Sequence, residues 1–286
     1  MRLLITGGLG LLGKEIDAVF RGRAEVRATD REEWDVTDPA ACRREVEAFR
    51  PDVVIHCAAY TAVDRAESEP AVANLLNVDG TRNVARACRE GGALMVTFGS
   101  DYIFDGVSSR PYREEDAANP LSVYGKTKWA AEQAVREEGG DHLLVRTQWL
   151  FGPAGGNFIR TILGKARQGE TLRVASDQVG CPTFSGDLAG AVRKLLEAGT
   201  RGTVHFSSEG ETSWFGLARH VLERCGLPTG SLFAAQTRDL PYPARRPVYS
   251  VLSKERYRAI TGASPRPWED AVGEYLGMID REGGAC

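Results

Sequence analysis

Residues 6–13 read Thr6-Gly7-Gly8-Leu9-Gly10-Leu11-Leu12-Gly13, directly after the apolar run Arg2–Ile5. Counted from Gly7 the stretch is G-x-x-G-x-x-G, and counted from Gly8 it is G-x-G-x-x-G. Between a strand and a helix, such glycines allow a tight turn and bring backbone N–H groups to a pyrophosphate at the helix N-terminus. A glycine turn without a ligand is the alternative. Because the motif opens a βαβ pattern, we favour a dinucleotide site with contacts from Gly7, Gly10, Leu11, Leu12 and Gly13.

The first 150 residues alternate short β-rich runs with helical patterns. Such alternation predicts βαβ units around a parallel sheet, and therefore an α/β fold of the Rossmann type, doubly wound. Asp35–Pro39 is a helix-start signal, and the helical pattern from about Ala71 to Glu90 ends at Gly91-Gly92, a suitable C-cap. The expected strands are Arg2–Ile5, Glu25–Ala28, Val53–His56, Ala93–Phe98 and His142–Arg146.

Beyond Phe151 the alternation loosens. We expect a strand near Thr171–Val174, a helix over Leu188–Ala198, a strand over Gly202–Phe206 and a helix begun by Thr212 or Ser213. The run Leu240–Pro247 holds too many prolines for a central strand or a helix. Residues 1–150 are thus predicted to form an NAD(P)-binding domain. Residues 151–286 are predicted to form a smaller, mainly α+β substrate lobe, some of whose segments could return to the Rossmann sheet.

Charge and composition narrow the class of protein. The chain has 286 residues, with 36 basic against 39 acidic side chains and a net charge of -3, so no global basic field exists to hold nucleic acid or an anionic membrane. A small-molecule partner is favoured. No run approaches the roughly 18 apolar residues of a membrane helix, and the N-terminus lacks the apolar core of a signal peptide. We therefore expect a cytoplasmic protein.

The six cysteines are scattered, without a C-x-x-C pair or a cluster with histidine. They are expected to be buried or free thiols in a reducing cytosol, and no metal site is expected. The six are Cys42, Cys57, Cys88, Cys181, Cys225 and Cys286.

The end of the second expected strand carries Asp30-Arg31, near the position that reads the adenosine ribose of a dinucleotide. Asp30 could accept from a ribose 2′-OH, which implies NADH. Arg31 could pair with a 2′-phosphate, which implies NADPH. A solvated turn is the third reading, and the sequence leaves the three open.

Further cofactor contacts are expected where other strands end on the same rim. Small side chains there let a dinucleotide approach the backbone. The expected contacts with adenine and the nicotinamide ribose are Asp35, Val36, Ala58, Ala59, Tyr60, Thr61 and Phe98.

Tyr124 precedes Lys128 by four residues, and Ser100 lies 24 residues before the tyrosine. On a helix, Tyr124 and Lys128 point from one face, so the ammonium can lower the phenol's pKa and make it a usable acid near neutral pH. An accidental pair on a surface helix is the alternative. The pair gains weight from the glycine turn and from Ser100.

With the glycine turn, Ser100, Tyr124 and Lys128 in this order, the chain resembles the extended short-chain dehydrogenase/reductases. Within them it is similar to the family that reduces 4-keto sugars linked to dTDP. The resemblance covers nearly the whole chain, and the segments after Lys128 lie outside the general cofactor motifs. The stretches that carry it are His56–Asp64, Gly99–Gly106, Asn119–Lys128, Arg146–Phe151, Gly156–Phe158, Asp177–Thr183 and Arg246-Pro247.

The resemblance implies roles for individual residues. Tyr124 would donate the proton, Lys128 would be its electrostatic partner and a nicotinamide-ribose contact, and Ser100 would hold the substrate carbonyl. Many family members have threonine at the position of Ser100. Trp149 would lie beside the sugar nucleotide, with core packing as the alternative. Further substrate contacts are expected from Asp101, Asn157, Gln178, Thr183, Arg245 and Arg246.

The resemblance also bears on how the catalytic lysine is held and on whether the chain forms a dimer. Asn77 matches a helix asparagine that supports the catalytic lysine through water in the wider superfamily. Some family members carry magnesium near a dimer contact. A homodimer is therefore one expectation, but the carboxylates of such a magnesium site cannot be located in this sequence, so no metal site is predicted.

The implied activity is NAD(P)H-dependent reduction of the 4-keto group of a dTDP-linked 6-deoxyhexose. Another nucleotide-sugar ketoreductase or an epimerase is the nearest alternative, since the same Ser/Tyr/Lys set serves both reactions. An NADP-binding regulatory subunit of methionine adenosyltransferase is the alternative outside catalysis. The intact Ser100, Tyr124 and Lys128 weigh against a protein that only binds.

Overall fold

The computed structural model describes residues 1–281, and its centre is a parallel sheet of six strands in the order β10-β5-β4-β3-β1-β2. The strands are β1 (Arg2–Thr6), β2 (Glu25–Thr29), β3 (Val53–His56), β4 (Leu94–Ser100), β5 (His142–Thr147) and β10 (Gly202–His205). Each neighbouring pair is parallel. The strand order reverses next to β1, which is where open α/β sheets bind ligands.

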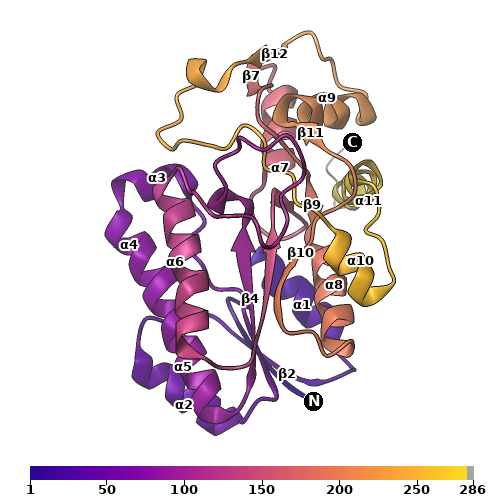
Figure 1. Cartoon of the computed structure of the whole chain (residues 1–286). Helices are drawn as coiled ribbons and strands as arrows, with labels where there is room; N and C mark the ends of the chain where they lie inside the picture. The colour runs from indigo at the N-terminus through magenta and orange to yellow at the C-terminus, as the bar shows by residue number, and fades with distance from the viewer. Residues whose placement is uncertain (282–286) are drawn as a thin grey trace.

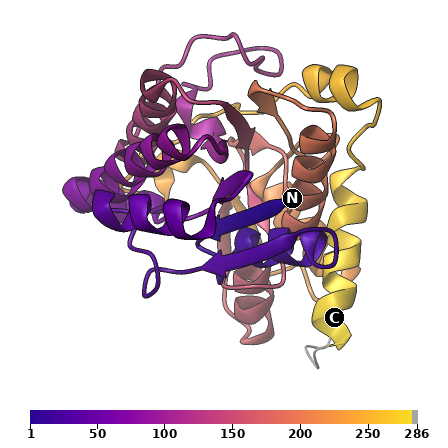
Figure 2. The ribbon, with the colours of Figure 1, turned by 90° about the horizontal axis from the view of Figure 1, so that it is seen from below.

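Helices cover both faces of this sheet (Figures 1 and 2). Successive strand residues alternate between the faces, so Leu3 and Ile5 belong to one core and Leu4 to the other. The first face is covered by α1 (Leu11–Phe20), α8 (Ser185–Glu197) and α10 (Glu255–Thr261). The opposite face is covered by α2 (Pro39–Phe49), α5 (Thr81–Gly91) and α6 (Val123–Glu138). The predicted doubly wound α/β fold is confirmed.

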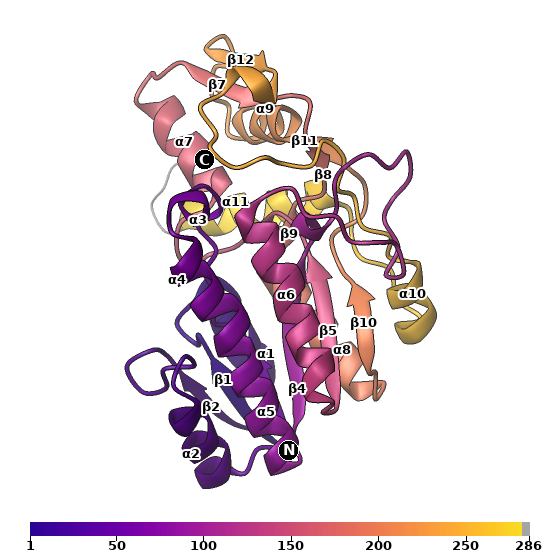
Figure 3. The ribbon, with the colours of Figure 1, turned by 60° about the vertical axis from the view of Figure 1, so that its left-hand side comes forward.

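A second group of elements sits over the carboxyl ends of the strands, and Figure 3 shows β5 and β10 pointing toward it. Its helices are α7 (Phe158–Arg167), α9 (Trp214–Arg224) and α11 (Trp268–Arg281). Three two-stranded sheets join them: β7 (Leu172–Ala175) with β12 (Leu232–Ala235), β8 (Val179–Gly180) with β11 (Thr212–Ser213), and β6 (Leu150–Phe151) with β9 (Thr183–Phe184). This group has its own apolar core around Tyr275 and Leu217.

The segments predicted from local signals lie where they were expected, with shifted ends. Asp38 caps α2 with Pro39 in its first turn, and Ser213 caps α9. Leu240–Pro247 forms neither strand nor helix. Strand β4 runs to Ser100, two residues past the predicted end, because its pairing with β5 continues to Thr147.

The helix predicted over residues 71–90 is interrupted. It consists of α4 (Pro70–Asn74), a π turn (Leu75–Gly80) and α5, which ends at the left-handed Gly92 as expected. A short helix α3 (Val63–Ser68) precedes it. The π turn surrounds Asn77, and such turns are frequent at functional sites.

Among the cysteines, Cys42, Cys57, Cys88 and Cys181 are free. The expectation of thiols throughout is wrong for Cys225, which is disulfide-bonded. Cys286 lies outside the described residues. Within residues 1–281, no helix is long and apolar enough to cross a membrane, and no three His, Cys, Asp or Glu side chains are grouped to hold a metal ion.

Candidate active site

Two adjoining cavities open where the sheet meets the second group of elements. They share the glycine turn and the start of the loop after β3 as walls. The first, of about 510 Å³, is lined by the turn, Ser100, Tyr124, Lys128 and Trp149. The second, of about 370 Å³, reaches Asp30, Arg31, Asp35 and Val36. Together they form a path from the end of β2 to Tyr124, as an extended dinucleotide requires.

The glycine turn fits a dinucleotide because it leaves its backbone bare. Gly7 has a left-handed φ of +63°, and a Cβ there would lie 2.8 Å from the Ala58 nitrogen. A Cβ on Gly13 would lie 2.2 Å from the Gly7 oxygen, so only glycine lets α1 pack this close to the turn. Gly10 caps α1 without a side-chain hydrogen bond. The first N–H groups of α1 are thus left for a pyrophosphate.

The corner that would read the ribose contains Asp30 and Arg31, both in the second cavity. The Asp30 carboxylate accepts from the backbone nitrogens of Leu9, at 3.1 Å, and Arg31, at 2.8 Å. The carboxylate is therefore fixed against the glycine turn, whereas the Arg31 side chain is exposed. Since both side chains line the second cavity, the NADH interpretation through Asp30 and the NADPH interpretation through Arg31 each have their residue at this corner.

The far end of the second cavity has apolar walls that suit a purine. Val72 and Leu75 are about half exposed, at 50% and 47%, although both are large apolar side chains. With Leu76 and Trp34 they line the cavity beside Val36. Val72 and Leu75 belong to the segment that was predicted to be helical from about Ala71 to Glu90, and neither was predicted to line a cavity. The feature that identifies them as cavity residues is the exposure of large apolar side chains beside the glycine turn, and only the folded structure shows it.

The loop after β3 is held by Asn77. Its side-chain oxygen accepts from the Tyr60 nitrogen at 2.8 Å, and its amide nitrogen donates to Thr127 Oγ1 on α6 at 2.9 Å. Ala58, Ala59 and Thr61 line the cavities. Tyr60 does not, because its hydroxyl donates to Glu69 at 2.9 Å.

Ser100, Tyr124 and Lys128 converge in the first cavity. Ser100 is the last residue of β4, at the carboxyl edge of the sheet. Tyr124 and Lys128 lie one turn apart on α6, which Ser122 caps by accepting from the Gly125 nitrogen at 3.1 Å. The Lys128 ammonium donates to the Phe98 carbonyl at 2.7 Å. The three side chains predicted to be catalytic are therefore brought together.

Burial controls the protonation of this trio. It raises the pKa of Tyr124 to about 12, although the hydrogen bond with Ser100 acts in the other direction. It lowers the pKa of Lys128 to about 8. The predicted net lowering of the phenol's pKa is wrong, because burial raises the pKa of Tyr124 and the Lys128 ammonium is bonded to the Phe98 carbonyl. The phenol is protonated at neutral pH, as a proton donor must be.

Trp149 lines the first cavity in a strained backbone conformation, with φ of +45°. Its ring stacks on Trp214, and Gly180 leaves the space for it, since a Cβ there would lie 2.6 Å from the indole. Trp214 also lines the cavity, as do Tyr102, Thr147 and Gln148. None of these four was predicted. No local signal links Trp214 to Trp149, because only the fold brings them together.

Other residues expected to contact substrate lie outside both cavities. Asn157 caps α7 and donates to Tyr275, and Gln178 donates to Thr237 at 2.9 Å. Thr183 is fully buried. Arg246 is ion-paired with Asp64 at 2.7 Å, and Arg245 is exposed. Asp101, by contrast, lines the first cavity.

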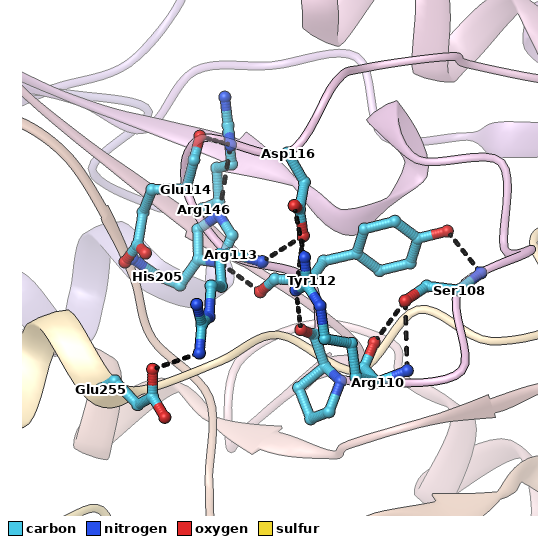
Figure 4. Close-up of polar contacts among 10 residues, drawn as sticks. Ser108, Arg110, Tyr112, Arg113, Glu114, Asp116, Arg146, His205 and Glu255 are labelled. Carbon is cyan, nitrogen blue, oxygen red and sulfur yellow. Dashed lines mark hydrogen bonds and ion pairs between the residues drawn. The ribbon is translucent and has the colours of Figure 1, made fainter.

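A buried polar cluster supports α6 from the side of β5 and β10. Arg146 is ion-paired with Glu132 at 2.8 Å, with both side chains 2% exposed. Its guanidinium also donates to the Glu114 carbonyl and contacts His205 (Figure 4). Burial lowers the pKa of His205 to about 3, so the imidazole is neutral beside the guanidinium. The helix that carries Tyr124 and Lys128 is thus tied to the sheet.

The chain is similar to known proteins over nearly its whole length. Residues 1–280 match the model of the RmlD substrate binding domain. The chain is 41% identical over 281 residues to a dTDP-4-dehydrorhamnose reductase of Streptomyces griseus, covering 96% of this chain and 92% of that protein. Two solved dTDP-4-dehydrorhamnose reductases superpose with a TM-score of 0.94. The one from Clostridium acetobutylicum is 36% identical, with 98% and 100% of the two chains covered. The one from Bacillus anthracis, in complex with NADP, is 33% identical, with 97% and 99% covered.

Proposed function

The chain belongs to the family of the RmlD substrate binding domain, and from this premise we propose that it reduces dTDP-4-dehydro-L-rhamnose to dTDP-L-rhamnose with NADPH or NADH. The observation that carries the proposal is the convergence of Ser100, Tyr124 and Lys128 beside the glycine turn. A keto sugar whose C4 carbonyl lies between these three side chains and the glycine turn would be reduced at C4.

The residues present fit a nicotinamide dinucleotide. Gly7, Gly10 and Gly13 would hold its pyrophosphate at the start of α1, and Asp30 or Arg31 would meet its adenosine ribose. When bound, the reduced nicotinamide supplies the hydride that the carbonyl carbon receives. The complex of the Bacillus anthracis relative with NADP favours NADPH and the Arg31 reading.

The chain's own residues supply the proton and the orientation. Tyr124 donates its proton to the carbonyl oxygen as negative charge develops there. The Ser100 hydroxyl donates a hydrogen bond to the same oxygen, which stabilises that charge. The Lys128 ammonium, one helical turn from Tyr124, stabilises the phenolate that proton transfer leaves. Trp149 presents an indole face to the sugar.

The alternatives are less well supported. An epimerase would return its hydride to the sugar, but the curated relatives with 33–41% identity over nearly the whole chain include several named as reductases of dTDP-linked sugars. A subunit that only binds NADP has no need of a protonated phenol beside a buried lysine. Neither alternative has an observation in its favour.

The experiment mixes the purified protein with enzymatically generated dTDP-4-dehydrorhamnose and either NADPH or NADH. The expected result is oxidation of one coenzyme equivalent per keto sugar, with dTDP-L-rhamnose as the product. Conversion of the sugar without net coenzyme oxidation would establish an epimerase instead. No reaction with either coenzyme, in a protein that still binds NADPH, would contradict the proposal and favour a binding role.

Location and assembly belong to the same proposal. Consumption of a reduced nicotinamide coenzyme supports a cytoplasmic enzyme. A homodimer is proposed from the family resemblance, and sedimentation of the purified chain tests it. The division into a cofactor domain, residues 1–150, and a mainly C-terminal substrate lobe is likewise a proposal, which dTDP protection of the lobe from hydrogen exchange would support.

A further inference from the structure

Asp101 is a buried carboxyl group directly behind Ser100. It begins the short 3-10 helix Asp101–Ile103 after β4 and is 2% exposed. One oxygen, Oδ2, accepts from the Ser250 hydroxyl at 2.6 Å, and the other, Oδ1, accepts from the Ser100 hydroxyl at 3.2 Å. Among residues 1–281, no basic side chain forms an ion pair with it. Buried carboxylates without a cation are costly, so the group has a reason to be neutral.

The protonation state of Asp101 decides where the single proton of Ser100 points. An ionised carboxylate only accepts hydrogen bonds. The Ser100 hydroxyl must then donate to Oδ1, and it has no proton left for a substrate carbonyl. Its oxygen meanwhile accepts from the Tyr102 nitrogen at 3.2 Å. In this state Ser100 can stabilise no oxyanion.

A neutral Asp101 reverses the bond. Oδ2 already accepts from Ser250, so the acidic proton belongs on Oδ1, facing Ser100. The carboxyl O–H then donates to the Ser100 oxygen. The Ser100 proton is released toward the cavity, where Tyr124 delivers the second hydrogen bond that the carbonyl needs.

We propose that Asp101 is a positioning residue that must be protonated for Ser100 to donate to the substrate, and that Ser250 sets how readily Asp101 takes up that proton. The inference rests on the proposed reduction and deepens it. Ser250 lies in the C-terminal segment, where its nitrogen donates to the Val179 carbonyl at 2.8 Å, and it does not line the cavity. A residue 150 positions away would thereby tune a hydroxyl in the active site.

The pH dependence follows with a definite sign. Burial raises the pKa of Asp101 to about 7, and the hydrogen bonds from Ser250 and Ser100 act in the other direction. The neutral form is therefore lost as pH rises through about 7, and activity falls with it. The titratable groups that face Asp101 are Tyr102 and Tyr124, and burial raises the pKa of both, so they remain neutral there.

Lys128 titrates in the same cavity, with a pKa of about 8. Its loss of charge would produce a second fall in activity at higher pH. Variants that change Asp101 alone separate the two falls.

The test records kcat/KM from about pH 5.5 to 9, for four proteins, with each profile normalised to its own maximum. The wild type is expected to lose about tenfold per pH unit above the Asp101 pKa. Ser250→Ala removes a donor that favours the carboxylate, so its fall shifts to higher pH. Asp101→Asn keeps a donor toward Ser100 and cannot ionise, so its profile retains only the fall at the Lys128 pKa.

Ser253→Ala is the matched control. Ser253 lies in the same segment and accepts from the Glu255 nitrogen, but it has no contact with Asp101. Its profile is expected to match the wild type. A fall near neutral pH that neither Asp101→Asn nor Ser250→Ala changes would overturn the inference.

Carbon-13 NMR of aspartate-labelled protein gives a readout that does not need turnover. The resonance missing from Asp101→Asn identifies the group, which is expected to titrate near pH 7 and higher in Ser250→Ala. Titration near the ordinary value for aspartate would overturn the inference whether or not the enzyme turns over. If Asp101 titrates as expected but the wild type oxidises no coenzyme at any pH, the proposed reduction fails and the proton arrangement between Asp101 and Ser100 is supported.

Discussion

The indole of Trp149 stacks on that of Trp214, with ring centroids 3.7 Å apart and planes 11° from parallel. Trp149 sits in a left-handed backbone conformation that costs energy for a bulky residue. Phe158 packs against the other indole at 4.6 Å. Trp214, at the start of α9, thus fixes the orientation of the indole that we propose faces the sugar.

Replacing Trp214 with alanine should raise KM for the keto sugar nucleotide by about 2- to 13-fold, since a stacked aromatic pair contributes about 0.5–1.5 kcal/mol. The value of kcat should change less, because Trp214 does not reach the carbonyl. Near-ultraviolet circular dichroism should lose the signal of the paired indoles. Trp214→Phe should restore most of the affinity. Equal losses of affinity for NADPH and for the sugar nucleotide would show a general structural role instead.

Removing the Tyr124 hydroxyl tests the proton donor. Tyr124→Phe should lower kcat by about 10²–10⁴ while NADPH binding is retained, because a positioned acid contributes that much and the ring remains. Steady-state kinetics and fluorescence titration with NADPH measure the two effects. Tyr242→Phe is the control, since Tyr242 is exposed and outside the cavities. A Tyr124→Phe enzyme with wild-type turnover would contradict the assignment.

Adding one methyl group at Gly13 tests the dinucleotide cradle. Gly13→Ala would place a Cβ 2.2 Å from the Gly7 oxygen, so α1 must move away from the turn. We expect loss of measurable NADPH binding and a lower melting temperature. Gly190→Ala in α8 is the matched control, because a Cβ there meets nothing within 4 Å. It should stabilise the protein by up to about 1 kcal/mol through helix propensity and leave NADPH binding unchanged.

The parts of the fold that were predicted from the sequence depend on local signals. The glycine turn, the Asp38 cap and the alternating strands each fit within a few residues, so their physics is visible in the chain. The π turn at Asn77 was not predicted. The Asn77 side chain bonds to Tyr60 and Thr127, both distant in sequence, so no local pattern shows these contacts. The same limit explains why Trp214 was missed.

The candidate site divides in the same way. Residues at strand ends, such as Ser100 and Ala58, could be placed because parallel strands end on one edge. Substrate contacts of Asn157 and Gln178 were predicted from the family resemblance alone. In the structure the two side chains instead donate hydrogen bonds within the second group of elements, to Tyr275 and Thr237. Protonation could not be predicted from residue type at all. The pKa of Tyr124 depends on burial, which no spacing reveals.

Arg31 should decide the coenzyme. Its exposed side chain lies in the second cavity, where a 2′-phosphate of NADPH would be. Arg31→Ala should raise KM for NADPH roughly tenfold or more, as expected for a lost charge-assisted hydrogen bond, and leave KM for NADH nearly unchanged. Arg23→Ala, exposed and outside that cavity, is the control. If Arg31→Ala changed KM for NADPH and for NADH equally, Arg31 would not distinguish the coenzymes, and Asp30 would be the residue that contacts the adenosine ribose.

The buried ion pair of Arg146 and Glu132 should be among the largest single contributions to stability near the site. Glu132→Gln leaves the guanidinium of Arg146 buried without its counter-charge, and such losses cost about 3–5 kcal/mol. The packing around the pair leaves little room to adjust, since a Cβ on Gly99 would lie 2.5 Å from a Glu132 oxygen. Urea unfolding measures the loss. The exposed pair Arg193–Glu197 on α8 provides the comparison, and Glu197→Gln should cost no more than about 0.5 kcal/mol. If the two variants lose equal stability, the guanidinium is satisfied by Glu114 and His205 alone, and Glu132 does not anchor α6.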